Sequence, residues 1–108
     1  DGHGPDLARA AEGRDVAVPS LLLAHQPKQV HDAAEHGIWL TLSGHTHGGQ
    51  IWPFGYLVAL VQPYVAGLHH HTERSMIYVS RGTGYWGPPM RLGARHELTV
   101  LTLRQAAA

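Results

Sequence analysis

Two histidines one residue apart, His45 and His47, are the side chains of this sequence whose spacing best suits metal chemistry. They follow an apolar run at 37–42 and stand in a turn that contains three glycines. A strand that delivers imidazoles into such a turn can present them to a metal ion at its carboxyl end. Both rings would point to one face of a regular strand, so we expect the glycines, which tolerate unusual backbone angles, to aim each ring at a different ion. The alternative is a polar turn that holds two histidines and no metal.

His25 is a third candidate ligand, because it ends another short apolar run at 20–25. Pro27 then opens a helix that reaches residue 35 or 36, and an apolar run at 38–43 leads into the turn. We expect a strand–helix–strand unit whose strands are buried on both faces. Such units place ligands at the carboxyl ends of their strands, which would bring His25 and His45 together. Taken alone, a histidine at position 25 is more often a hydrogen-bonded structural residue than a ligand.

The rest of the chain predicts the elements that surround this unit. Helix-forming residues indicate a helix at 5–12, and 50–63 is expected to be an irregular loop with short extended pieces. Two extended stretches predict a hairpin at 64–80. A glycine-rich loop at 81–94 and a closing strand at 97–103 follow it.

The composition limits which partners and which metal ligands the chain can use. The chain has 108 residues, enough for one domain at most, and its 44% apolar and 15% charged residues are an ordinary globular balance. Eight basic and eight acidic residues cancel, which argues against a nucleic-acid partner held by bulk charge. Without cysteine and with ten histidines, any transition-metal site must use nitrogen and oxygen ligands. No segment approaches the roughly 20 apolar residues of a membrane span.

The glycine-rich loop offers candidate substrate contacts. Arg81 or Arg91 could pair with a phosphate, and Gly82 and Gly84 would allow close approach to the main chain. Tyr85 and Trp86, and the aromatic residues at 52–56, could cover an organic group. The alternative is a structural loop that packs its aromatic side chains on the sheet.

The remaining histidines have other interpretations. Three consecutive histidines at 69–71 could suggest a metal cluster at the predicted hairpin tip or strand end. Successive strand residues alternate faces, so we favour a solvated loop. His31, His36 and His96 are interpreted as surface residues.

Three strings carry a family resemblance: LAHQP at 23–27, LSGHTHGGQ at 42–50 and YVSRGTG at 78–84. They resemble the C-terminal part of calcineurin-like metallophosphoesterases, most closely the bacterial branch whose members often carry an N-terminal membrane or export segment. The resemblance covers about 1–104. It implies an α/β fold of the α+β sandwich type, with 1–108 a single partial domain that forms the C-terminal half of a four-layer αββα sandwich. It also implies a membrane-associated or exported protein, with this segment itself soluble.

The resemblance also implies an activity, the hydrolysis of a phosphomonoester or phosphodiester by a metal-bridging hydroxide. Two divalent ions (Mn, Fe or Zn) would be bound, one by His25 and His45 and the other by His47. The substrate would be a phosphorylated small molecule or a lipid-like phosphoester.

The chain departs from the family pattern in what it lacks. The D-x-H, G-D-x-x-D and G-N-H-[DE] strings of the family do not occur upstream of the histidines, and Asp1–His3 is rejected as a ligand string because it precedes a helix. We therefore identify no catalytic residue here and expect the isolated chain to be inactive, to need a missing N-terminal half and to self-associate through its exposed sheet. The alternative is a non-catalytic metal-binding or structural module that retains the fold.

Overall fold

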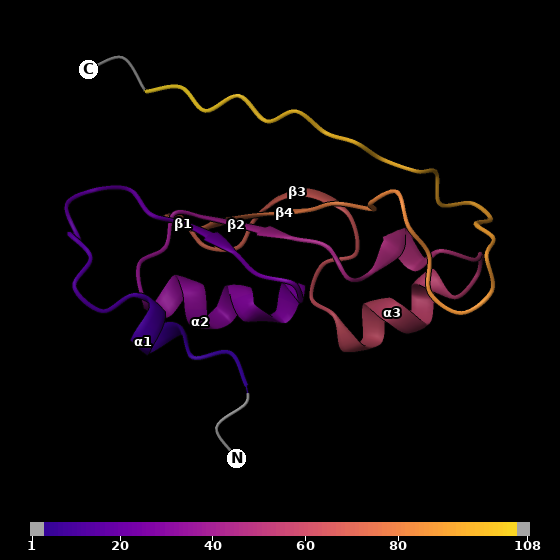
Figure 1. Ribbon diagram of the computed structural model, residues 1–108, viewed down its shortest axis with the longest axis horizontal. Coiled ribbons are helices and arrows are strands. Elements are labelled where there is room, and N and C mark those ends of the chain that lie inside the picture. The colour runs from indigo at the N-terminus through magenta and orange to yellow at the C-terminus, as the bar shows by residue number, and fades with distance from the viewer. Residues whose placement is uncertain (1–3, 106–108) are drawn as a thin grey trace.

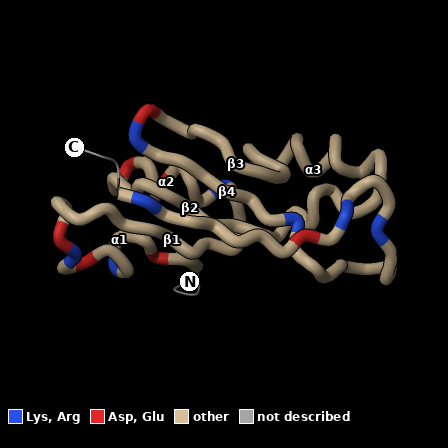
Figure 2. The backbone as a smooth tube through the Cα atoms, turned by 90° about the horizontal axis from the view of Figure 1, so that it is seen from above, with Lys and Arg blue, Asp and Glu red and all other residues tan. Residues whose placement is uncertain are grey.

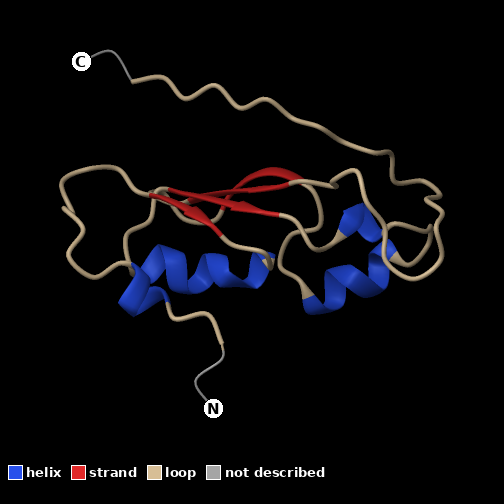
Figure 3. Cartoon of the chain, viewed as in Figure 1, coloured by secondary structure: helices blue, strands red, loops and turns tan. Residues whose placement is uncertain are grey.

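The computed structural model describes residues 4–105 and shows a mixed four-stranded sheet with helices on one face (Figures 1 and 3). The strands are β1 (Leu21–Leu23), β2 (Leu40–Ser43), β3 (Gly67–His70) and β4 (Met76–Val79), in the order β1-β2-β4-β3. Pairing is parallel between β1, β2 and β4, and antiparallel between β4 and β3. This mixed arrangement confirms the predicted α/β class.

The predicted strand–helix–strand unit is present. Pro27 opens a short 3-10 turn, Pro27–Gln29, which continues into helix α2 (Val30–Glu35). Gly37 ends this helix with a φ of 68°, a value that glycine adopts without strain. The inner face of α2 presents Val30 to Ile77 and Val79 of β4, and all three are fully buried. This small apolar cluster is the core that fixes the sheet on the helix layer.

The burial expected for the two strands is right for β2 and wrong for β1. Leu40 and Thr41 of β2 are buried, whereas Leu21 and Leu23 of β1 are 40% and 76% exposed. β1 is an edge strand of the sheet, and burial alternates along it, so that Leu21 and Leu23 are exposed while Leu22 between them is half-buried. An apolar run therefore identified the strand without showing what covers it.

Two further predictions are wrong in the second half of the chain. Part of the expected irregular loop at 50–63 is helix α3 (Gly55–Val61), and the expected strand at 97–103 is an extended segment with no strand partner among residues 4–105. α3 has no polar face, so periodicity did not indicate an amphipathic helix. The segment 97–103 runs past the sheet on the side away from α2, and Leu98 is 91% exposed there (Figure 1).

Other predicted elements are confirmed in kind. Helix α1 (Leu7–Ala10) is shorter than predicted and begins at Asp6, whose side chain accepts from Arg9 N at 3.0 Å. The hairpin β3–β4 forms with His69 opposite Ile77. Among the described residues no helix combines the length and the apolar character needed to cross a membrane.

Candidate metal centre

His25 and His45 lie in contact where β1 and β2 end side by side. The parallel pairing of Leu23 with Leu42 brings both carboxyl ends to one edge, and Gly44 N donates to His25 O at 3.2 Å. His45 Nδ1 lies 3.1 Å from His25 Nε2, and the ring centroids are 4.8 Å apart. The structure thus brings together the two side chains predicted to share one ion, although their ligand role stays a prediction.

His47 lies on the same cavity as this pair. The cavity has a volume of about 470 Å³ and is lined on its polar side by the three histidines and Thr46. Its other walls come from the apolar Val58, Val61 and Trp86 and from the polar side chain of Gln62. His47 Nδ1 is buried and has no hydrogen-bond partner within residues 4–105. Because a buried polar nitrogen is normally paired, His47 Nδ1 needs a partner that these residues do not supply.

The turn that carries the histidines is bent at the histidines themselves. His45 and His47 have φ angles of 69° and 49°, in the left-handed region that costs free energy for residues other than glycine. Gly48 and Gly49 also have positive φ, but Gly44 does not. Two glycines and two candidate ligands therefore share the left-handed positions of the loop, and part of the backbone strain is carried by the candidate ligands.

Several contacts hold this strained loop in place. Thr46, which is 3% exposed, donates from Oγ1 to Val65 O at 2.6 Å. Arg91 Nη2 donates to His47 O at 2.8 Å. At Gly49 an added Cβ would lie 2.9 Å from Gly55 N, so the loop packs directly on the start of α3. The local sequence and two distant segments together produce the histidine geometry.

Gln50 joins the histidine loop to the 81–94 loop. Its side chain is 2% exposed, and its Nε2 donates to Trp86 O at 2.7 Å while its Oε1 accepts from Trp86 N at 2.7 Å. This pair of bonds orients the backbone of Trp86, whose side chain forms a wall of the cavity. Sequence reasoning assigned Gln50 no role, although it closes the SGHTHGGQ string.

Electrostatics favour the metal-binding form of the central histidine. Burial lowers the pKa of His45, and the neighbouring His25, His47 and Lys28 lower this pKa further. Neutral imidazole is the form that ligates metal ions. The arrangement therefore keeps His45 ready to coordinate at neutral pH.

The described residues fit part of a metal site and not a whole one. Imidazole nitrogens suit Mn, Fe or Zn, and the unpaired nitrogen of His47 and the His25–His45 pair supply such donors. In the part of the chain that the structure describes, no group of three or more His, Asp, Glu or Cys side chains converges to hold an ion. The carboxylates that a two-ion site needs would have to come from elsewhere. The rejected string at 1–3 lies outside the described residues.

The predicted substrate contacts at 81–91 have different surroundings. Arg91 donates from Nη1 to Gly84 O at 2.6 Å and from Nε to Ala94 O at 2.8 Å, in addition to its bond to His47. The side chain of Arg81 is 47% exposed, and its Nη1 lies 3.8 Å from a carboxylate oxygen of Glu97. Arg91 thus holds backbone together and Arg81 has free surface. A phosphate contact by Arg81, Arg91 or the backbone of Gly82 and Gly84 stays a prediction.

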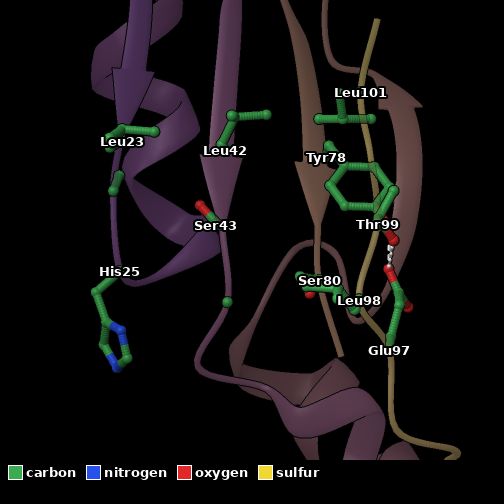
Figure 4. A pocket seen from close by; sticks show the side chains of 12 residues that line it. Leu23, His25, Leu42, Ser43, Tyr78, Ser80, Glu97, Leu98, Thr99 and Leu101 are labelled. Atoms are coloured by element: carbon green, nitrogen blue, oxygen red, sulfur yellow. Dashed lines mark hydrogen bonds between the residues drawn. The ribbon is translucent and has the colours of Figure 1, made fainter. Parts of the chain in front are cut away.

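A second cavity of about 460 Å³ lies on the face of the sheet away from α2, with His25 at one end (Figure 4). Tyr78 Oη donates to Glu97, and Thr99 Oγ1 donates to Glu97 Oε1 at 2.7 Å. The bond from Tyr78 holds the pKa of Glu97 below its usual range, whereas burial, aided by Glu97, raises the pKa of Tyr78. This polar contact ties 97–99 to β4, and sequence reasoning missed it.

The histidines at 69–71 lie at a strand end, one of the two predicted places, but they do not form the predicted solvated loop. His69 and His70 belong to β3, and His69 stacks on Tyr64 with centroids 4.7 Å apart. His71 Nδ1 lies 3.1 Å from Tyr64 Oη, and its ring meets that of His31 at 4.8 Å. Alternation along the strand puts His69 and His71 toward the packed side and leaves His70 exposed. His31 and His96 are exposed and His36 is half-buried.

Comparison with known proteins adds a second line of information. The chain is 52% identical over 100 residues to an uncharacterized metallophosphoesterase of Helicobacter pylori strain J99, across 92% of this chain and 27% of that protein. It is 50% identical over 107 residues to a Bos taurus transmembrane protein with metallophosphoesterase domain, across 97% of this chain and 24% of that protein. An uncharacterized metallophosphoesterase of Campylobacter jejuni is 45% identical over 104 residues, across 94% and 27%.

The chain therefore spans about a quarter of the length of the curated relatives it matches. These relatives come from bacteria and from animals, so the matches do not restrict the chain to the bacterial branch that its motifs suggested. No protein-family profile matches the chain, and no solved structure does.

Proposed function

We propose that this chain, which belongs with the metallophosphoesterases through its homology to one segment of them, supplies the histidine ligands of a phosphoester-hydrolysing metal site. The observation that carries the proposal is that three imidazoles line one cavity and that two of them are in contact, with His45 Nδ1 3.1 Å from His25 Nε2. His25 and His45 would hold one divalent ion and His47 a second. Such a pair of ions, when bound, supplies Lewis acidity toward the phosphoryl group and makes a water molecule more acidic.

The chain's own residues have distinct parts in this proposal. The strained backbone at His45 and His47 brings two imidazoles to the cavity lining from positions two residues apart. Arg81, with exposed surface beside the loop, would pair with the phosphate of a monoester or diester. Trp86 would cover the organic part of the substrate and limit water on that side. Carboxylate ligands and the proton donor to the leaving group would come from the other segment of the intact protein.

The intact protein is further proposed to act at or near a membrane. Two relatives, from Danio rerio and Bos taurus, are named as transmembrane proteins with a metallophosphoesterase domain. A phosphorylated small molecule and a lipid-like phosphoester are both compatible with the apolar walls of the cavity.

The test compares the intact natural protein with three single variants, His25→Ala, His45→Ala and His47→Ala. Metal content and hydrolysis of a generic phosphodiester are both measured, with His70→Ala as the matched control because His70 is exposed on β3. We expect each of these three variants to lose bound metal and to have a kcat/KM at least about a hundredfold lower, since each removes one metal ligand. Unchanged activity in His45→Ala would defeat the assignment. Bound metal without any hydrolysis in the wild type would favour the alternative, a non-catalytic metal-binding module.

A further inference from the structure

Helix α3 and the loop beside it expose an unusual number of large apolar side chains next to the histidine cavity. We define the α3 patch by six of them: Trp52, Phe54, Leu57, Leu60, Tyr85 and Trp86, which are 52–81% exposed. Exposed apolar groups that adjoin one another mark an interaction surface. The two stretches do adjoin, because Trp52 N donates to the main chain at Leu92 O at 2.7 Å and Gln50 binds the main chain of Trp86.

The charges around the α3 patch are mainly basic. Residues 36–72 contain no Asp, Glu, Lys or Arg, and residues 81–95 contain Arg81, Arg91 and Arg95 but no acidic residue. Figure 2 shows α3 itself without charge, and at the same end of the molecule it shows blue positions together with a red one. Glu97 is the acidic residue that pairs with Arg81, which leaves Arg91 and Arg95 as the basic residues outside that pair. An apolar surface with amphipathic aromatic rings and a cationic border is complementary to an anionic lipid surface.

We propose that the α3 patch docks on the surface of an anionic lipid bilayer and so places the histidine cavity at the level of the headgroups. α3 has seven residues, about 10 Å of helix, which is too short to span a bilayer but suits a segment that lies in its interface. Trp86 belongs to the α3 patch and also lines the histidine cavity, where Val58 and Val61 of α3 lie beside it. A protein partner seated on the patch would cover this wall, whereas a lipid surface would bring phosphoesters to it.

The consequence for substrate rests on the proposed function. A site that opens beside a docked lipid surface would favour phosphoesters carried by lipids over soluble ones, because the headgroup is held near the cavity at high local concentration. The docking itself does not depend on hydrolysis, so the two can be tested separately.

The test uses the intact natural protein with every tryptophan outside this chain replaced by phenylalanine. Within the chain, variants keep one tryptophan at a time: Trp39, Trp52 or Trp86. Vesicles of phosphatidylcholine and phosphatidylglycerol with bromine on the acyl chains quench fluorescence only where a ring enters the lipid. We expect quenching of Trp52 and Trp86 but not of Trp39, which lies next to β2. Equal quenching of all three, or none, would overturn the docking proposal.

A matched pair of double variants completes the test. Leu57→Glu with Leu60→Glu changes residues that are 57% and 81% exposed, and Val18→Glu with Val16→Glu changes residues that are 57% and 82% exposed at the opposite end of the molecule (Figure 1). The first pair should lower vesicle partitioning about tenfold or more, and the second should leave it unchanged. Higher salt should weaken wild-type binding, since it screens the arginine border.

Other occupants of the patch would be recognised in the same experiment. A second copy of the chain would give a dimer by sedimentation that the Leu57 and Leu60 changes dissociate, with no lipid quenching, and would overturn the proposal. A segment of the same protein that covers the patch would shield Trp52 from both bromolipid and aqueous acrylamide, and this result would also overturn the proposal. If the protein docks on vesicles but has no hydrolytic activity, the docking inference is supported and only the proposed function is contradicted.

Discussion

Arg91 Nη2 donates a hydrogen bond to the carbonyl oxygen of His47 at 2.8 Å, across 44 positions of sequence. The same guanidinium also donates to the carbonyls of Arg81 and Gly84. A single side chain therefore fixes the backbone of a candidate metal ligand relative to the loop that forms one wall of the same cavity.

Replacing Arg91 tests this role. Arg91→Lys keeps the charge but loses the planar fork of donors, so several carbonyls lose their partner. We expect a loss of about 2–3 kcal/mol in unfolding free energy and about tenfold weaker metal binding, measured by urea unfolding and metal titration of the intact protein. Arg95→Lys is the control, because only the backbone of Arg95 takes part in these bonds. A phosphate-binding role alone would instead raise KM and leave stability unchanged.

Gly49 tests the packing of the histidine loop on α3. Gly49→Ala would force a Cβ against the backbone of Gly55 at a φ of 82°, so we expect a loss of more than about 2 kcal/mol in unfolding free energy. Gly87→Ala is the matched control, because its φ is also positive, at 64°, but nothing lies within 4 Å of the added carbon. Equal losses in the two variants would show that backbone strain, and not the contact with α3, decides the requirement for glycine.

The contact of His71 with His31 predicts a pH dependence of stability. Burial, and secondarily His31, lower the pKa of His71 from its usual value of 6.5. The unfolded chain then takes up its proton first as the solution is acidified. The contribution of this histidine is therefore fully present above about pH 6.5 and is lost as pH falls through that value toward the lowered folded pKa.

This predicts a fall in unfolding free energy between pH 7.5 and pH 5.5, to which His45, whose pKa is also lowered, adds in the same direction. His71→Gln should make the fall shallower in chemical unfolding followed by circular dichroism. His70→Gln, at an exposed neighbour on β3, should not. A pH profile that is identical in wild type and His71→Gln contradicts the prediction.

The uncovered face of the sheet predicts association of the isolated 108-residue chain. Leu21 and Leu23 of β1 and Leu68 of β3 are 40%, 76% and 56% exposed. The segment 97–103 runs past the sheet (Figure 1), and cavities of about 460 Å³ and 280 Å³ lie between the two. We expect dimers or larger species in sedimentation velocity, reduced by Leu23→Lys with Leu68→Lys and not by Val16→Lys. A clean monomer of the wild-type chain would contradict this.

Local sequence patterns were sufficient to predict those elements and candidate ligands that depend on one short segment of the chain. The run at 38–43 predicted β2, Pro27 and Gly37 marked the ends of the helical stretch, and the spacing of His45 and His47 identified the candidate ligands. The meeting of His25 with His45 followed from parallel strands having adjacent carboxyl ends. These inferences succeed because they need only periodicity, backbone preference and the geometry of a single strand–helix–strand unit.

Inferences that depend on a partner distant in sequence failed. The alternating residues at 97–103 have the pattern of a strand, but no strand of residues 4–105 lies beside them to pair with. α3 was not predicted because its side chains are apolar on every side, so no amphipathic pattern marks it. Its apolar surface is exposed because no other described element covers it. The histidines at 69–71 were placed in solvent, although Tyr64 and His31 draw His71 toward the packed side.

The sequence by itself determined the kind of chemistry, since imidazole nitrogens and carboxylate oxygens but no thiolates are available to a transition metal, and two imidazoles stand in one short turn. The tertiary structure decided how that chemistry is held. It turned the backbone at His45 and His47 as well as at the glycines, and it directed Arg91 to carbonyl oxygens that sequence could not place near it. The physical reason is that a residue type limits what a side chain can bind, whereas its partner depends on which distant segments the fold brings within hydrogen-bonding distance.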